Sequence, residues 1–190
     1  KKKISVGLLG GSFYPVHEGH LEITNQAIKK LNLDEIWWLT AVKHPFKNFI
    51  NEKNFLSRIE KTKKFINNPK IKIIINKKFL INNYSIKNLR KIIEFYQNTN
   101  FIWIMGADNL LTFHKWYKWK EIFKLLPIAV FDRPKFSNIS LSSISAIAFS
   151  KNRYSEKASK KLYSINPPAW IFLHEKLNYL KSEKIRNRKE

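Results

Sequence analysis

The sequence predicts an α/β protein with a doubly wound, mostly parallel sheet of five to six strands and helices on both faces. Three observations lead to this fold class. Short continuous apolar runs alternate with longer segments of helical apolar spacing, a glycine turn joins the first run to the first helical segment, and no Pro/Gly/Ser-rich linker divides the 190 residues. We therefore expect a single domain, 1–190, long enough to bury a sizeable core.

The predicted strands are short apolar runs, which in chain order span 6–9, 36–39, 71–75, 101–105, 127–131 and 170–173. Apolar residues at helical spacing predict helices over 21–31, 55–66, 86–96 and 119–126, and one further helix over 139–149. Asn67, Asn68 and Pro69 end the second helix, and Ser85 fits the N-cap of the third. The run 101–105 is the most apolar, so we expect it to be the central strand.

A glycine turn, Gly10-Gly11, separates the first strand from the first helix. Adjacent glycines let the backbone approach a ligand closely, and the helix N-terminus that follows favours an anion. His17 and His20 share a face if both lie on the first turn of that helix. The combination predicts a phosphate site, although surface or capping histidines beside an ordinary turn remain the alternative at this point.

Asp108 follows the fourth strand as part of Gly106-Ala107-Asp108. Open α/β sheets bind ligands at the carboxyl ends of their strands, where the strand order reverses. If the first and fourth strands flank that point, the Gly10 turn and Asp108 lie side by side. Asp108 then accepts from a ribose hydroxyl or holds Mg²⁺ indirectly, or it only caps a helix.

Two stretches resemble a known family. Residues 10–20, Gly-Gly-Ser-Phe-Tyr-Pro-Val-His-Glu-Gly-His, resemble the signature of the nucleotidyltransferase superfamily of Rossmann-like adenylyltransferases, with Tyr14 where that family has Asp or Asn. Residues 105–119, which contain Phe113-His114-Lys115-Trp116, resemble the bacterial nicotinate mononucleotide adenylyltransferases. The resemblance implies adenylyl transfer from ATP to nicotinate mononucleotide, giving nicotinate adenine dinucleotide and pyrophosphate in NAD biosynthesis.

The resemblance also implies roles for individual residues. The expected catalytic residues are His17, His20, Lys47 and Arg186. The expected ATP-binding residues are Gly10, Gly11, Ser12, Phe13, Gly19, Gly106, Asp108, Arg133 and Ser182. The expected pyridine-nucleotide-binding residues are Ser85, Trp116 and Tyr117, of which Trp116 is free to stack on the pyridine while Trp119 belongs to the core. The sequence has no metal-ligand box, so Mg²⁺ is expected to arrive with ATP.

The tail, 181–190, contains a degenerate form of the family's last phosphate-binding motif. Ser182 and Arg186 match the family pattern, whereas Lys181 and Glu183 do not. Glu183 places an anion near the expected triphosphate, which favours the hypothesis of a degenerate nucleotide-binding module with weak activity. A second alternative is a pantetheine-phosphate adenylyltransferase or cytidylyltransferase, because both share the His17-x-Gly19-His20 pattern.

The formal net charge of +22 raises the possibility of a nucleic-acid partner. The lysines are dispersed rather than confined to one patch, so we attribute the charge to composition and expect no such partner. A basic field still attracts anionic nucleotides. The absence of cysteine fits a reducing compartment, and no apolar run is long enough to span a membrane, so we expect a cytoplasmic protein. The oligomeric state stays open.

Overall fold

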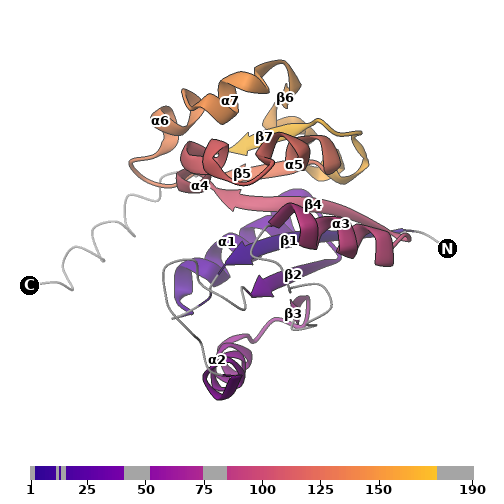
Figure 1. The fold of residues 1–190 in the computed structure, drawn as a ribbon, viewed down its shortest axis with the longest axis vertical. Coiled ribbons are helices and arrows are strands. Elements are labelled where there is room, and N and C mark those ends of the chain that lie inside the picture. Colours follow the sequence, from indigo (N-terminus) through magenta and orange to yellow (C-terminus); the bar gives the residue numbers. More distant parts are fainter. Residues whose placement is uncertain (1–2, 12, 14–15, 41–51, 75–84, 175–190) are drawn as a thin grey trace, which may run out of the picture.

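The computed structural model describes residues 3–11, 13, 16–40, 52–74 and 85–174. These residues form one sheet of seven strands in the order β3-β2-β1-β4-β5-β7-β6 (Figure 1). Every strand pairing among them is parallel. The strands are β1 (Ile4–Gly11), β2 (Glu35–Thr40), β3 (Ile71–Ile74), β4 (Thr99–Gly106), β5 (Ile128–Phe131), β6 (Arg153–Tyr154) and β7 (Trp170–Leu173).

The α/β class and the six expected strands are confirmed, but the expected count of five to six is wrong. The additional strand is β6, whose two residues are both exposed. Two exposed residues form no apolar run, so β6 leaves no pattern in the sequence. It pairs with β7 through Arg153 and Trp170 and forms one edge of the sheet.

The sheet reverses its strand order between β1 and β4, as expected. Leu8 pairs with Trp37 of β2 on one side and with Trp103 of β4 on the other. Strands β2 and β3 then follow in one direction, and β5 and β7 in the other. The carboxyl ends of β1 and β4 therefore lie together at the point where doubly wound sheets bind ligands.

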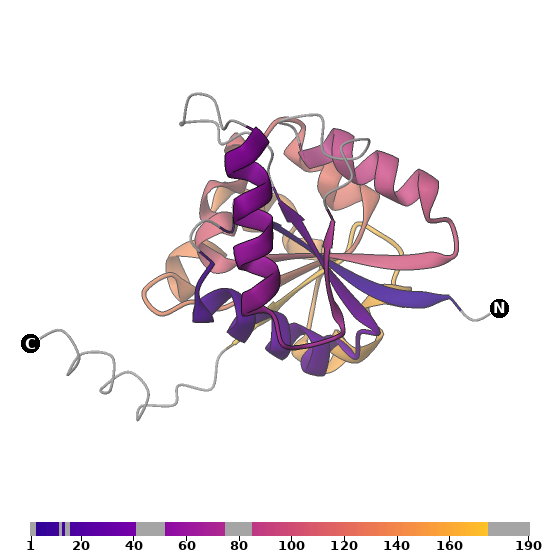
Figure 2. The same ribbon diagram turned by 90° about the horizontal axis from the view of Figure 1, so that it is seen from below.

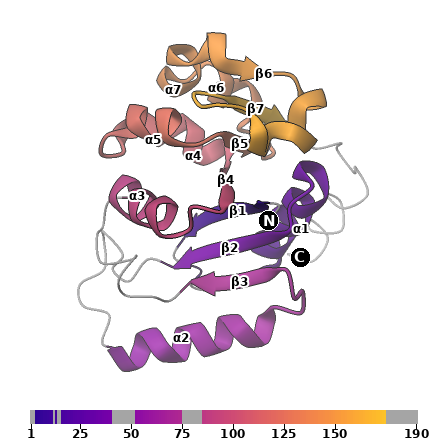
Figure 3. The same ribbon diagram turned by 90° about the vertical axis from the view of Figure 1, so that its right-hand side faces the viewer.

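Alternate residues of the central strand enter two different cores. Phe101, Trp103 and Met105 of β4 face one core, and Ile102 and Ile104 face the other. Both faces are covered by helices, which explains why the strands appear as continuous apolar runs rather than alternating ones. Figure 3 shows α3, α4 and α5 on one side of the sheet and α1 on the other.

The four helices expected up to residue 126 are confirmed, and one further helix that was not expected, over 107–112, stands among them. The helices of the described chain are α1 (Glu18–Leu31), α2 (Glu52–Phe65), α3 (Ser85–Phe95), α4 (Ala107–Thr112), α5 (Trp119–Leu125), α6 (Ser137–Leu141) and α7 (Ile144–Ala148), with 3₁₀ turns η1 (Phe113–Lys115), η2 (Ser150–Asn152) and η3 (Glu156–Ser164). Helix α2 lies beyond the β3 edge, as Figure 3 shows, and so stands in front of the sheet when the molecule is seen from below in Figure 2. No helix in the described ranges is long and apolar enough to cross a membrane.

The single helix expected over 139–149 is wrong, because α6 and α7 divide this stretch. Ser143 stands between them with an extended backbone, and its Oγ accepts a hydrogen bond from the Ala146 N–H at 3.2 Å. A serine in this position satisfies a free N–H group at the start of a new helix. The apolar residues on which the expectation rested include Ile139 and Ile144, which are exposed.

Candidate active site

The β1 carboxyl end packs too closely against its neighbours to carry side chains. A Cβ at Gly10 would lie 2.6 Å from Cη2 of Trp103, and one at Gly11 would lie 3.3 Å from the Phe13 ring. A Cβ at Gly19, in the first turn of α1, would lie 3.1 Å from the His17 ring. Because these positions carry no side chain, the backbone itself borders the carboxyl end of β1.

The Phe13 side chain points into the core and packs beneath the His20 ring. Its φ is 46°, a left-handed conformation that turns the chain sharply after β1. Its ring is buried and stacks on Trp38 at 4.5 Å, with the His20 ring 5.1 Å away. Only the backbone of Phe13 is therefore placed to contact a ligand, because its side chain packs beneath the His20 ring.

His17 and His20 lie together at the N-terminus of α1. His17 is the N-cap residue, and His20 is the third residue of the helix. Their ring centroids are 3.9 Å apart, and the His17 N–H donates to His20 Nδ1 at 3.4 Å. Because Nδ1 accepts this bond, neutral His20 carries its proton on Nε2, where it can be donated to a ligand.

The turn that carries His20 is anchored to the core. Thr24 Oγ1 donates to the His20 carbonyl at 2.6 Å and accepts from Trp38 Nε1 at 3.0 Å. Thr24 and Trp38 are fully buried, and the aromatic floor under His20 includes the same Trp38. Burial, together with the charges of His17 and Arg133, lowers the pKa of His20 to about 4. The imidazole is thus neutral at pH 7.

Asp108 and Arg133 form an ion pair across the ends of β4 and β5. Asp108 Oδ2 accepts from Arg133 Nη1 at 3.2 Å. A Cβ at Gly106 would lie 2.4 Å from Asp108 Oδ1 and 2.8 Å from Arg133 Nε, so only glycine leaves room for the pair. Gly106 is also the N-cap residue of α4, so the alternative in which Asp108 caps this helix is wrong.

Trp116 and Tyr117 follow η1. Trp116 packs on the sheet face opposite to the one that carries Phe13 and Trp38. The Trp116 ring is half-buried, 5.0 Å from Phe113 and 6.4 Å from Trp103. Trp116 packs against the edge of this core and is only half-buried, and its stacking on a pyridine ring stays a prediction. Tyr117 is exposed, and Ser85 is the first residue of α3.

Four expected site residues lie outside the described residues: Ser12, Lys47, Ser182 and Arg186. The same holds for Tyr14, Lys181 and Glu183, three of the residues that motivate the hypothesis of a degenerate module. Within the described ranges, no group of three His, Cys, Asp or Glu side chains is arranged to hold a metal ion.

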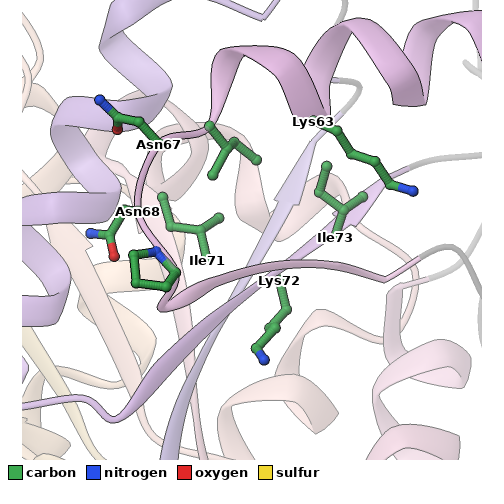
Figure 4. A pocket seen from close by; sticks show the side chains of 8 residues that line it. Lys63, Asn67, Asn68, Ile71, Lys72 and Ile73 are labelled. Atoms are coloured by element: carbon green, nitrogen blue, oxygen red, sulfur yellow. The ribbon is translucent and has the colours of Figure 1, made fainter.

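One cavity, of about 500 Å³, lies elsewhere, at the amino end of β3 and the end of α2 (Figure 4). One of its polar lining residues, Asn68, bonds both the Asn25 side chain and the Lys70 N–H. None of the predicted site residues that the structure describes lines this cavity. The cavity therefore does not mark the candidate active site.

Trp103 is the residue of this region that the sequence pattern did not single out. Its six-membered ring rests against Gly10, and Trp116 packs against it edge-on. A tryptophan inside an apolar strand indicates only a core position, so no pattern separates Trp103 from its neighbours. Its position became apparent only from the packing across β1 and β4.

Comparison with known proteins shows which family this chain belongs to. Residues 8–188 match the family model described as cytidylyltransferase-like. A protein of Agrobacterium fabrum named "Probable nicotinate-nucleotide adenylyltransferase" is 40% identical over 182 residues, which cover 96% of this chain and 97% of the relative. A protein of Rhizobium meliloti with the same name is 37% identical over 98% of this chain and 99% of the relative.

The fold is similar to that of a solved Plasmodium falciparum protein, described as nicotinic acid mononucleotide adenylyltransferase complexed with NaAD. Its TM-score is 0.65 at 19% identity, over 97% of this chain and 83% of that chain. The family model and the curated relatives both cover nearly the whole chain. The chain therefore belongs to the cytidylyltransferase-like family and, within it, to the nicotinate-nucleotide adenylyltransferases.

Proposed function

We propose that this protein transfers the adenylyl group of ATP to nicotinate mononucleotide, giving nicotinate adenine dinucleotide and pyrophosphate. The observation that carries the proposal is the meeting of two polar pairs, His17–His20 and Asp108–Arg133, at the carboxyl ends of β1, β4 and β5. The charge of Arg133 is one of the causes that lower the pKa of His20, so Arg133 lies close enough to act on the imidazole. Full-length relatives with this named activity support the proposal.

The reaction is a displacement at phosphorus. A 5′-phosphate oxygen of the mononucleotide attacks the α-phosphorus of ATP, a new P–O bond forms, and the bond from that phosphorus to the oxygen bridging the α and β phosphates breaks. Pyrophosphate leaves with the bonding electron pair. Such transfers require positioning and neutralisation of negative charge more than covalent help from the protein.

His20 fits the role of a hydrogen-bond donor to the phosphates. The bond from His17 N–H to its Nδ1 leaves the Nε2–H for the ligand, and the aromatic floor and Thr24 hold the ring in place. A neutral donor that is already oriented stabilises the charge that builds up on the phosphate oxygens in the transition state. His17, which is exposed, lies beside it as a second imidazole at the helix N-terminus.

Arg133 and Asp108 fit the second side of the phosphate site. The Arg133 side chain is 43% exposed, so it retains N–H groups for a phosphate while Asp108 Oδ2 fixes its direction. Asp108 Oδ1 is buried with no hydrogen-bond partner among the described residues, and a carboxylate oxygen suits a water bound to Mg²⁺. We propose that Mg²⁺ comes with ATP, where it neutralises phosphate charge.

Several expectations stay predictions within this proposal. Lys47, Arg186, Ser12 and Ser182 lie outside the described residues, and their contacts with ATP rest on the family resemblance. The pyridine contacts of Ser85, Trp116 and Tyr117 rest on the same resemblance. The cytoplasmic location and the absence of a nucleic-acid partner likewise remain predictions.

The test is an acceptor panel with ATP and Mg²⁺. Pyrophosphate release is measured with nicotinate mononucleotide, nicotinamide mononucleotide and 4′-phosphopantetheine as acceptors, and CTP replaces ATP in a parallel series. We expect turnover with ATP and a pyridine mononucleotide. Turnover of phosphopantetheine alone, or of CTP in preference to ATP, would contradict the proposal, and so would binding of both substrates without turnover.

A further inference from the structure

Strand β3 forms one edge of the sheet and pairs only with β2 among the described residues. Alternate residues of a strand direct their backbone N–H and C=O groups to the same side, so in an edge strand every second residue faces away from the sheet. The Ile36 N–H of β2 donates to the Lys70 carbonyl at 2.9 Å, which places the backbone groups of Lys70 and Lys72 on the β2 side. Ile71 and Ile73 therefore direct theirs outward.

Three of the four outward backbone groups have no hydrogen-bond partner in the part of the chain that the structure describes. The Ile71 N–H donates to the Asn68 carbonyl at 3.0 Å and closes the turn before the strand. The Ile71 carbonyl and both backbone groups of Ile73 make no such bond there. An edge with free backbone donors and acceptors is a template to which another extended chain can add as a strand.

The cavity of about 500 Å³ lies beside this edge and gives it an apolar wall. Its apolar lining consists of Ile66, Pro69, Ile71 and Ile73. Figure 4 shows the side chains of Ile71 and Ile73 on the opposite side of the strand from Lys72. Because side chains alternate between the two faces of a strand, a chain that adds to β3 directs every second side chain towards the isoleucines. Apolar side chains fit those positions.

The remaining side chains of an added strand lie on the face that carries Lys72. The Lys72 side chain is 52% exposed and pairs with Glu35 Oε1 at 3.6 Å, so its three N–H donors are not all used by that carboxylate. Lys63 also lines the cavity, and the lining, which consists of described residues alone, contains no Asp or Glu. Opposite charges on neighbouring strands stabilise their pairing, so acidic side chains fit this face.

A second copy of this chain fits the edge poorly. Its own β3 would bring Lys72 against the lysines of the first copy, and like charges on neighbouring strands are destabilising. The net charge of +22 adds repulsion between copies, whereas it attracts an acidic protein.

We propose that the β3 edge binds an extended segment of an acidic partner protein in which apolar and acidic residues alternate. The backbone of the segment pairs with Ile71 and Ile73, its apolar side chains enter the cavity, and its carboxylates lie beside Lys72. Adenylyl transfer does not depend on this edge, because none of the described residues expected to bind the substrates lines the cavity.

A labelled peptide, Val-Glu-Val-Glu-Val, probes the edge of the unmodified protein by fluorescence anisotropy. We expect it to bind, and we expect Val-Lys-Val-Lys-Val to bind about tenfold more weakly or worse. Two further peptides carry N-methyl groups either on the valines or on the glutamates. Only one of these two sets of N–H groups faces β3 in a paired strand, so one methylated peptide should lose binding and the other should keep it.

Ile73→Pro removes the outward N–H without touching the bonds to β2, a position at which an edge strand tolerates proline. We expect the acidic peptide to bind this variant about five- to tenfold more weakly, the usual loss for one hydrogen bond. Ile73→Val keeps the N–H and is the matched control. Lys72→Gln should also weaken binding, whereas Lys64→Gln, at an exposed lysine of α2 that does not line the cavity, should not.

The peptide measurements on the wild type decide the proposal even if Ile73→Pro fails to fold. Equal affinities for the two methylated peptides, equal affinities for the acidic and the basic peptide, or no binding of the acidic peptide would overturn it. A dimer in sedimentation velocity that Ile73→Pro dissociates would assign the edge to a second copy and would overturn it as well.

Discussion

His20 is held in one orientation by contacts on several sides, and its proposed role as a hydrogen-bond donor depends on that order. The ring lies on Phe13, its Nδ1 accepts from the His17 N–H, and its backbone carbonyl is bonded by Thr24. We expect His20→Ala to lower kcat about 10²- to 10³-fold, the loss typical of one preorganised donor at a developing oxyanion. Steady-state kinetics with saturating ATP measure this decrease in kcat.

The control for this variant is Glu22→Ala, also in α1 but a turn beyond the N-terminus, which should retain activity. Thermal unfolding of both proteins separates loss of the donor from loss of the fold. A decrease of tenfold or less in His20→Ala, with unfolding unchanged, would show that His20 only shapes the turn.

The lowered pKa of His20 also makes the stability of the fold depend on pH. The ordinary value is 6.5 and the folded value is about 4, so between these limits the unfolded chain binds a proton that the folded chain does not. The contribution of His20 to the free energy of unfolding is therefore present above pH 6.5 and is lost as the pH falls towards 4. After discounting for partial exposure, we expect about 1–2 kcal/mol.

Urea unfolding of the wild type and of His20→Gln at pH 7 and pH 4.5 measures this contribution of His20 to the free energy of unfolding. The wild type should lose about 1–2 kcal/mol more than the variant over that interval. Carboxylates titrate in both proteins, so the difference between the two isolates His20. Parallel losses would mean that the imidazole titrates equally in the folded and unfolded chains.

At the scale of elements, the division of 137–148 into α6 and α7 depends on one serine. Ser143 accepts from the Ala146 N–H, is nearly buried, and starts α7. We expect Ser143→Ala to lower the free energy of unfolding by about 1 kcal/mol, the usual cost of a lost N-cap. Ser142→Ala is the matched control, because its exposed hydroxyl donates only to the Asn138 carbonyl at 3.3 Å. Equal effects in urea unfolding would contradict the capping role.

The elements that the sequence predicted share one physical property. Runs such as 101–105 are buried on both faces, so each residue had to be apolar, and the pattern is unambiguous. Strand β6 is too short and exposed to leave such a pattern. The region 137–148 misleads because Ile139 and Ile144 are spaced as in a helix but face solvent, while Ser143 interrupts the backbone.

The candidate site could be predicted only in part, because its motifs can be read from the sequence but the packing around them cannot. His20 and Asp108 stand in motifs whose spacing carries chemistry, and the order of β1 and β4 brings these motifs to one edge. The packing around them could not be read from the sequence, because Thr24 under His20 and Trp103 beside Gly10 are ordinary core residues by composition. Trp38, the second partner of Thr24, and Gly10, the neighbour of Trp103, come from distant positions along the chain.

For the molecule as a whole, the charge of +22 should act on substrate capture rather than on the fold. A strongly basic protein attracts ATP and the mononucleotide over a distance set by the ionic strength, about 30 Å at 0.01 M and about 8 Å at 0.15 M. We therefore expect kcat/KM for ATP to fall about tenfold as the salt concentration rises over that range. The value of kcat, which reports on the bound complex, should change little.

Initial rates at low ATP concentration measure how kcat/KM depends on salt. A comparison of sodium chloride with sodium acetate at equal ionic strength separates electrostatic screening from binding of one anion at the phosphate site. Screening depends on ionic strength alone, so the two salts should give the same curve. A fall with chloride alone would indicate occupation of the site, and a kcat/KM independent of both salts would mean that the dispersed lysines contribute no steering. Steering of a small anion needs no basic patch, because the field of the entire molecule guides its approach.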